Sequence, residues 1–362
     1  MHFFLINYSS LGVINILRQK TYKALYIDGN MRRDLLLVLF LLSILPFVAA
    51  HSVYVLDPQT VHDNMGRDDL YVTSALAQPI TWICAVGILI LILILRHAAL
   101  SYKPFVSYMS RCVRQLEGYK DLTPWMLRLS LGIALIGGGV GGFFISPTLP
   151  FSYLSLLQTA LGFVFLLGFG VRIASVLTLG LFLYGLSVYP ELYGNLELIG
   201  ATLALLLLGS GKPGLDDITQ LHWWRHSARW LKAHQGYASF ILRFFLGITF
   251  IFLAFHEKFL NPHLTEAVVN QYQLTRFVPV APNIWVVGAG LVELTLGLLL
   301  LFGFYTRTTA TLSFAFIGLT LFYFGESVTS HVTLFGILSV INVLGAGRYS
   351  LDHYLKKRHF VL

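Results

Sequence analysis

Few ionisable residues lie inside the apolar stretches of this chain, and Glu293 is the clearest of them. It lies about ten residues into its stretch, and therefore near the midplane of a bilayer that the stretch crosses. A carboxyl group at that depth costs several kcal/mol unless it is protonated, paired or hydrated. Burial favours the protonated form, which suits proton transfer. Glu293 is our first catalytic candidate, and an acid that only hydrogen-bonds a neighbouring helix is the structural alternative.

A second group follows the preceding apolar stretch, where His256, Glu257 and Lys258 are consecutive. Successive helical residues point about 100° apart, so the three cannot all face one site. We predict that His256, the deepest, faces inward as a second catalytic candidate, and that Lys258 snorkels outward. An interfacial polar cap is the alternative. Glu326 and His331 are expected at the outer mouth of the last two helices, where they could join His256 around a cavity.

The chain as a whole is apolar enough to need lipid as its solvent. It has 362 residues, of which 56% are hydrophobic and 12% charged, and its mean hydropathy is +0.72. These values exclude a soluble globular protein and a disordered one. The formal net charge of +8 fits basic loops on the cytoplasmic side better than nucleic-acid binding. Cys84 and Cys112 form no CxxC motif, which excludes a thioredoxin-like redox site.

The apolar stretches predict a polytopic membrane protein. A leading helix at 79–95 is followed by eight further stretches, which gives nine spans. Basic residues collect in the loops 96–124 and 211–237 and in the tail, so that side is predicted to be the cytoplasm. The odd number of spans then places residues 51–78 outside and the C-terminus inside. We predict an integral protein of a bacterial or archaeal cytoplasmic membrane, bound by the lipid bilayer.

The expected parts of the chain run in the following order. They are an upstream extension with a signal-like segment at 1–50, an extracytoplasmic segment at 51–78, the leading helix at 79–95, a basic cytoplasmic loop at 96–124, a degenerate four-helix repeat at 125–217, a cytoplasmic amphipathic linker at 218–237, a second four-helix repeat at 238–354 and a basic tail at 355–362. The signal-like segment has the charged, apolar and small-residue regions of a cleavable leader, and an uncleaved first helix is the alternative.

A metal site is a weaker alternative on the outer side. Cleavage after Val48-Ala49-Ala50 would leave His51 at the amino terminus. An amino-terminal histidine can chelate copper through its amine and ring nitrogen, with His62 as a further ligand. No HxxxH or HExxH spacing among the histidines of the outer side supports a metal site, so exposed histidines without a ligand role are the expected outcome.

The two groups of four stretches share sequence markers that indicate a tandem repeat. The markers are Arg128-x-x-Leu-Gly with Arg243-x-x-Leu-Gly, Gly168-Phe-x-x-Arg172 with Gly303-Phe-x-x-Arg307, and Gly-x-Gly-Lys-x-x-Leu-Asp216 with Gly-x-Gly-Arg-x-x-Leu-Asp352. An even number of spans in each repeat makes the two halves parallel. Glycines that pack helices and arginines that snorkel at helix ends are the structural interpretation of these markers.

At these residues the chain resembles the DoxX family of small four-helix membrane proteins. The carrying features are Arg243-x-x-Leu-Gly, His256-Glu-Lys, Glu293 with Gly297, Gly-Phe-x-x-Arg307 and the closing Ser350-Leu-Asp. The resemblance is good over 238–354 and weaker over 125–217. The family includes a subunit that resembles thiosulfate:quinone oxidoreductase, and many other members have no assigned activity. The resemblance therefore implies a fold more securely than a reaction. The two halves differ where chemistry would occur, because Glu293 aligns with Gln158, and this difference places any site in the second half.

The sequence thus predicts an all-α polytopic membrane protein with two tandem parallel four-helix bundles and a leading span. By resemblance, it is a quinone-linked membrane subunit of a redox system, with a membrane quinone as cofactor and a redox protein as partner. The catalytic candidates are Glu293 and His256, and the candidates for binding substrate or cofactor are Glu257, Lys258, Arg307, His331 and Glu326. A non-catalytic assembly protein and a carrier for a small solute or copper are the alternatives.

Overall fold

The computed structural model describes residues 52–66, 71–83, 86, 103–150, 152–216 and 230–357. The upstream extension, the signal-like segment, His51 and most of the predicted leading helix lie outside the described residues, as does most of the linker 218–237. Within the described ranges the chain is helical and has no strand. The prediction of an all-α fold is therefore confirmed.

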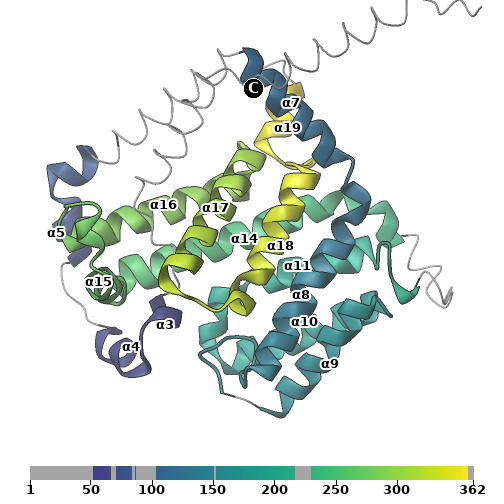
Figure 1. Ribbon diagram of the computed structural model, residues 1–362, viewed down its shortest axis with the longest axis horizontal. Helices are drawn as coiled ribbons and strands as arrows, with labels where there is room; N and C mark the ends of the chain where they lie inside the picture. The colour runs from purple at the N-terminus through teal and green to yellow at the C-terminus, as the bar shows by residue number, and fades with distance from the viewer. Residues whose placement is uncertain are drawn as a thin grey trace, which may run out of the picture. The chain divides into compact units, whose positions relative to one another are not determined.

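Eight long helices lie where the eight stretches after the leading helix were predicted (Figure 1). They are α8 (Thr123–Val140), α9 (Tyr153–Leu167), α10 (Val171–Val188), α11 (Glu197–Leu208), α14 (Ala238–Leu253), α16 (Pro282–Phe302), α17 (Thr306–Phe324) and α18 (Val328–Leu344). Four helical segments are long and apolar enough to cross a membrane, namely Lys120–Val140, Val171–Val188, Gln235–Leu260 and Pro282–Phe302. The polytopic membrane class is thus supported, and the count of nine spans stays a prediction.

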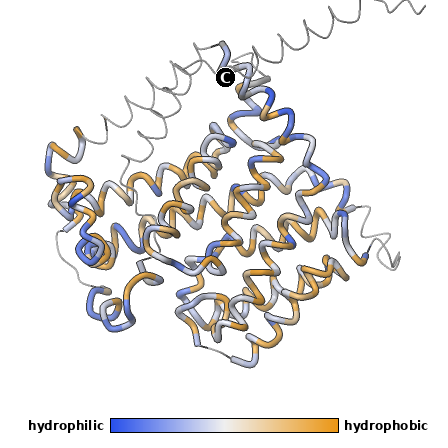
Figure 2. The backbone as a smooth tube through the Cα atoms, viewed as in Figure 1, coloured by the Kyte–Doolittle hydropathy of each residue, from blue (hydrophilic) through white to orange (hydrophobic). Residues whose placement is uncertain are grey.

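The shorter described helices lie at the two ends of the long ones. They are α3 (Ser52–Val55), α4 (Pro58–Asn64), α5 (Tyr71–Leu76), α7 (Lys103–Glu117), α15 (Pro262–Gln271) and α19 (Leu351–Lys357), with η1 (Lys120–Leu122), η2 (Pro190–Asn195), η3 (Gln235–Tyr237) and η5 (Leu274–Arg276) as short 3₁₀ turns and η4 (Ala254–Leu260) as a π-helix. Figure 2 shows apolar residues along the long helices and polar ones at α7 and around α4. This distribution is typical of helices that cross an apolar phase.

Local sequence signals explain where the long helices begin and end. The backbone amide of Ser152 donates a hydrogen bond to Oγ of Ser155 at 3.1 Å where α9 begins. Gly168 and Gly303 end α9 and α16 in the left-handed conformation, which glycine adopts without a steric penalty. These caps place the turn before α10 and the turn before α17 in the same way.

The last helix of each half packs against the first helix of the other half. Within each half, α8 packs on α9 and α14 on α16. Between the halves, α18 packs on α8, and α11 packs on α14 (Figure 1). The two halves therefore interlock along these helix pairs. Buried apolar residues of both halves form one continuous hydrophobic core across their boundary.

Two glycines permit the close approach between the halves. A Cβ atom on Gly200 of α11 would lie 2.8 Å from Cβ of Phe245 on α14. A Cβ atom on Gly336 of α18 would clash with the side chain of Ser130 on α8. Small residues at such crossings let helices pack tightly in lipid, where no hydrophobic effect drives them together.

The two arginine markers have structural roles at the predicted cytoplasmic end. Arg128 is buried and donates a hydrogen bond to the carbonyl of Pro213 at 2.6 Å. Arg243 is buried and donates to the carbonyls of Leu300 at 3.0 Å and Tyr349 at 2.6 Å. Each guanidinium group thus ties the first helix of its half to the loop that follows the last. The structural interpretation of these two arginines is the better one.

The two aspartate markers cap helices in the same region. Asp216 accepts hydrogen bonds from two amides at the start of α10, and Asp352 accepts from two amides at the start of α17. A carboxylate at a helix N-terminus satisfies free amides and stabilises the helix dipole. The halves therefore share these contacts, while the tandem repeat as a sequence unit stays a prediction.

Residues from the predicted extracytoplasmic segment form a second, smaller core at the other end of the long helices, which we call the outer end. Leu56 and the partly buried Tyr71 pack there against Leu264 and Val268 of α15 and Trp285 of α16. Helices α4 and α5 are thereby held on α15 and α16. This packing places α3, which precedes them, among the polar groups described below.

We expect Gly297→Ala to destabilise the protein by about 1–3 kcal/mol, because overpacking a close helix crossing forces the backbones apart. A Cβ atom on Gly297 of α16 would lie 2.8 Å from the carbonyl oxygen of Gly247 on α14. Gly288→Ala on the same helix is the matched control, because a Cβ atom there meets nothing within 4 Å. Thermal unfolding in detergent checks both variants, and equal midpoints would contradict the expectation.

Candidate functional site

A π-helical turn at the end of α14 decides which side chains enter the site. The segment Ala254–Leu260 is a π-helix, whose wider turn changes the angle between successive side chains. Glu257 and Lys258 therefore both face the interior, with exposed fractions of 1% and 0%. His256 is only partly buried and stacks on Phe252, with ring centroids 5.2 Å apart. The prediction that Lys258 snorkels outward while His256 faces inward is wrong, because it assumed α-helical spacing.

The interior side chains form a charged cluster, which we define as Glu257, Lys258 and Glu293. Lys258 Nζ lies 2.8 Å from Glu257 Oε2 and 3.2 Å from Glu293 Oε2. Glu293 comes from the middle of α16 and is 4% exposed. A lysine between two carboxylates keeps all three groups in contact inside an apolar bundle. The sequence therefore identified Glu293 correctly as a buried acid, but its cation partner was missed.

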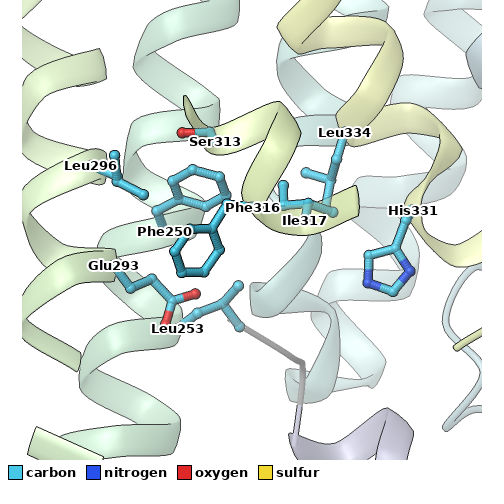
Figure 3. A pocket seen from close by; sticks show the side chains of 9 residues that line it. All are labelled: Phe250, Leu253, Glu293, Leu296, Ser313, Phe316, Ile317, His331 and Leu334. Carbon is cyan, nitrogen blue, oxygen red and sulfur yellow. The ribbon is translucent and has the colours of Figure 1, made fainter. Parts of the chain in front are cut away.

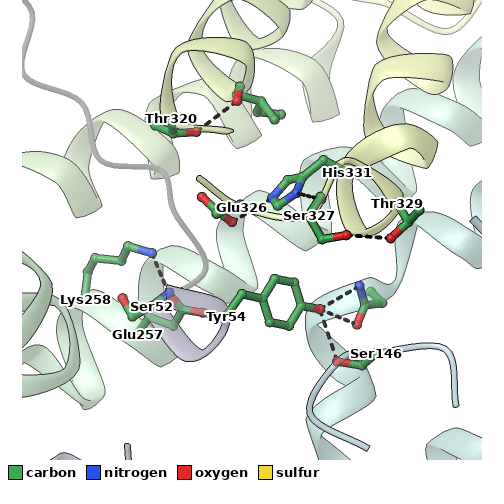
Figure 4. Close-up of polar contacts among 12 residues, drawn as sticks. Ser52, Tyr54, Ser146, Glu257, Lys258, Thr320, Glu326, Ser327, Thr329 and His331 are labelled. Carbon is green, nitrogen blue, oxygen red and sulfur yellow. Dashed lines mark hydrogen bonds and ion pairs between the residues drawn. The ribbon is translucent and has the colours of Figure 1, made fainter. Parts of the chain in front are cut away.

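Helix α3 supports the charged cluster from outside the second half. The backbone amide of Ser52 donates to Glu257 Oε2 at 2.9 Å (Figure 4). The hydroxyl of Ser52 lies 3.1 Å from that of Thr265 on α15, and Thr265 donates to the backbone carbonyl of Glu257 at 3.1 Å. Ser52 and Thr265 are both fully buried. The predicted extracytoplasmic segment therefore forms part of the site.

A second ionisable pair lies at the outer end of α17 and α18. His331 Nε2 lies 3.1 Å from Glu326 Oε2, and both side chains are almost fully buried. His331 Nδ1 lies 3.2 Å from the backbone carbonyl of Ser327. The prediction placed these two residues together at the mouth of the last helices, and they do form a pair there.

An apolar cavity joins the two groups of charges. It is lined by Glu293 and His331 together with apolar side chains of α14, α16, α17 and α18, chiefly Phe250, Leu253 and Phe316 (Figure 3). Its volume of about 20 Å³ is room for about one water molecule. A carboxyl group and an imidazole therefore share one small enclosed space between four helices.

Comparison with known proteins bears on this part of the chain. The family model of DoxX matches residues 238–326, the stretch that supplies Glu257, Lys258, Glu293 and Glu326. The chain carries a DoxX domain. No curated protein and no solved structure matches the chain.

Tyr54 of α3 connects the second half of the chain with the first half. Its hydroxyl lies 3.2 Å from Ser146 Oγ and donates to Asn195 Oδ1 at 3.4 Å. Its ring meets the edge of His331, with centroids 6.3 Å apart (Figure 4). Burial of the hydroxyl group raises the pKa of Tyr54 to about 12, and the carboxylates of Glu197 and Glu257 add to that increase.

We expect Tyr54 to make the protein sensitive to alkali. Its pKa of about 12 in the folded chain exceeds the ordinary tyrosine value of 10.0. The folded state therefore holds this proton more tightly, so its stabilising contribution is complete below pH 10 and is lost as the pH rises to about 12. Thermal unfolding of wild type and Tyr54→Phe across this range checks it. The midpoint of wild type should fall more steeply, and parallel curves would contradict the expectation.

Two other predicted site residues, Arg307 and His256, lie away from the charged cluster. Arg307 is at the start of α17, the opposite end from Glu326, and donates to the carbonyl of Asn342 at 2.9 Å and to Glu117 at 3.1 Å. These bonds tie helices together. His256 does not line the cavity of Glu293 and His331, and it does not line the second cavity described below. The prediction that His256 joins Glu326 and His331 around one cavity is therefore wrong.

The weaker metal prediction gains no support in the described part of the chain. No group of three or more His, Cys, Asp or Glu side chains there is arranged to hold a metal ion. His62 is exposed on α4, and His51 lies outside the described residues. The copper alternative therefore stays a prediction from the sequence.

Sequence reasoning missed one buried acid. Glu197, the first residue of α11, is 3% exposed and accepts a hydrogen bond from Thr249 of α14 at 3.1 Å. A signal for it existed, because Glu197 is a lone carboxylate at the start of an apolar stretch. Comparison of the two halves did not reveal it, since the corresponding position of the second half is Thr333, a neutral residue.

Proposed function

We propose that the chain is a membrane component of a redox system, in which the charged cluster takes up and releases the protons that accompany electron transfer. The observation that carries this proposal is Lys258, held between Glu257 and Glu293 in the interior. Ionisable groups in a membrane interior are costly, so their presence argues for function. Membership of the matched segment in the DoxX family supports a redox setting, because the family is often linked to such systems.

The cluster can change its protonation without leaving an isolated charge. When a proton joins Glu293, Lys258 still pairs with Glu257 at 2.8 Å. When the proton leaves, the Glu293 carboxylate is again 3.2 Å from the ammonium group. Each state thus keeps a charged pair, which lowers the cost of cycling between them. His331 lines the same cavity as Glu293 and offers an imidazole as a second group that can accept or donate a hydrogen bond there.

A quinone ring does not fit the cavity between Glu293 and His331. The chemistry of the lining is suitable, since a carboxyl group and an imidazole line the same apolar cavity. The volume of about 20 Å³ is unsuitable, because pockets for ligands of that size are about 300 Å³ or larger. We therefore derive no step through a quinone here. The quinone expected from the family resemblance would bind elsewhere or in another arrangement of Phe250 and Phe316.

The test begins with mass spectrometry of the full chain after gentle purification, to detect bound quinone, metal and partner chains. Thiosulfate as electron donor and a short-tailed benzoquinone as acceptor are then supplied to membranes that contain or lack the chain. A chain-dependent electron transfer with proton release supports the proposal. A stable partner complex without any chain-dependent electron transfer or proton movement would favour the assembly role instead and overturn it.

A further inference from the structure

A second cavity lies at the boundary between the two halves. Its lining comes from α3, α8, η2, α11 and α18 and includes Tyr54, Asn195, Glu197, Ser330 and Thr333. Its volume of about 20 Å³ again matches about one water molecule. Unlike the first cavity, it is lined largely by oxygen-bearing side chains.

The polar atoms of this second cavity call for a ligand that can donate and accept hydrogen bonds. Asn195, Glu197 and Thr333 are all buried. The hydroxyl oxygen of Ser330 is also buried and has no hydrogen-bond partner among the described residues. A buried hydroxyl group without a partner is destabilising, and a water molecule in the cavity would supply the missing hydrogen bond.

Both halves hold the carboxyl group at this cavity. Glu197 belongs to the first half, yet Thr249 of the DoxX domain donates a hydrogen bond to its Oε2 at 3.1 Å. Tyr54 lines the same cavity and touches His331 on its other side. Glu197 is thus a buried acid of the first half, at a position that does not correspond to Glu293 of the charged cluster.

We propose that this cavity holds one water molecule beside Glu197, and that Glu197 binds a proton there. The step transfers one proton and no electrons. A proton from the outer aqueous phase binds the water and makes it a hydronium ion. One O–H bond of that ion breaks as one O–H bond forms on the Glu197 carboxylate, and the water is left neutral. Release is the reverse step.

Other titratable groups surround this position. Tyr54 of α3 lies on the cavity, and beyond it lie Glu257 of η4 and the pair of Glu326 with His331 at the end of α17 and the start of α18. Helix α14 contributes the neutral Thr249. Glu197 is therefore the carboxyl group of the cavity itself, and Tyr54 separates it from the other acids.

The inference rests on the proposed function only for the destination of the proton, and its test requires no turnover. Infrared spectra of the full chain in lipid nanodiscs report protonated carboxyl groups directly. At neutral pH we expect a protonated-carboxyl band that Glu197→Gln removes. Glu191→Gln is the matched control, because Glu191 is an exposed glutamate on the adjoining η2 turn. Its spectrum should keep the band.

A second variant tests the infrared band of Glu197 without replacing Glu197 itself. Thr249→Val removes the hydrogen bond to Glu197 but keeps the side-chain shape, and should shift the band to higher frequency. A band that is unchanged in Glu197→Gln and unshifted in Thr249→Val overturns the proposal. So does a band that disappears when sodium chloride replaces choline chloride, since the site would then bind a cation. A band that persists in Glu293→Gln while turnover is lost supports Glu197 independently of the charged cluster.

Discussion

Glu293→Gln should lower proton-coupled electron transfer by at least about 100-fold, since general acid–base groups contribute about 10²–10⁴-fold. The amide keeps the size of the side chain and an oxygen that can accept a hydrogen bond from Lys258, now 3.2 Å from Glu293 Oε2. Lys258 also keeps Glu257 at 2.8 Å. Thermal stability and accumulation in the membrane should therefore change little. Full turnover in Glu293→Gln would contradict a role in proton transfer.

The first half provides the matched control for this substitution. Gln158 aligns with Glu293, and its amide bridges two backbone groups, donating to Leu135 at 2.9 Å and accepting from Ile145 at 2.8 Å. Gln158→Glu should add no activity, because the lysine partner is absent there. It should also lower stability by a few kcal/mol, since it loses the donor and buries an acid. A gain of turnover in this variant would show that position alone, without the charged cluster, suffices.

Lys258→Met should destabilise the folded protein by about 3–5 kcal/mol, the usual effect of removing one partner from a buried ion pair. The variant leaves Glu257 and Glu293 in the interior without the ammonium group that lies within 3.2 Å of both. Accumulation in the membrane and the thermal midpoint in detergent should both fall. The triple variant Lys258→Met with Glu257→Gln and Glu293→Gln should recover much of the loss, because it removes the buried charges together.

A surface lysine shows whether this loss is specific. Lys120 is half-exposed and lies 3.9 Å from Glu117. Lys120→Met should change stability by less than about 1 kcal/mol, as exposed ion pairs contribute little. Equal losses for Lys258→Met and Lys120→Met would mean that the buried charges do not interact as the distances indicate. A triple variant no more stable than Lys258→Met would mean that lost packing, and not uncompensated charge, causes the effect.

The helices could be predicted from the sequence because long apolar stretches ended by glycine carry their own signal. Gly168 and Gly303 mark helix ends that the structure has in the left-handed conformation. The directions of side chains could not be predicted at the end of α14. There, α-helical spacing placed His256 inward, and the π-helix placed Lys258 inward instead. A local change from an α-helix to a π-helix leaves no signal in the hydropathy of the sequence, yet it changes which residues face the interior.

The site was predictable one residue at a time but not as an assembly. A lone acid such as Glu293 stands out in an apolar stretch, whereas Ser52 contributes a backbone amide, which no side-chain pattern reveals. Tyr54 and Ser52 lie about 200 positions before Glu257 of the charged cluster in the sequence. The packing of the outer end, which includes α4 and α5, brings these two residues close to the cluster. The contribution of Glu197 likewise depends on the interlocked halves, because its partner Thr249 belongs to the other half.

Helix α9 has 15 residues and rises about 22 Å, whereas the hydrocarbon core of a typical bilayer is about 30 Å thick. Its outward side chains, including Leu156 and Phe163, are exposed to the surroundings of the bundle. Helix α16 has 21 residues and needs no such adjustment. On the nine-span topology predicted from the sequence, lipid beside α9 would thin, at a cost of a fraction of a kcal/mol for each ångström of hydrophobic mismatch. The acyl-chain length of the host membrane thus becomes a determinant of stability for the first half more than for the second.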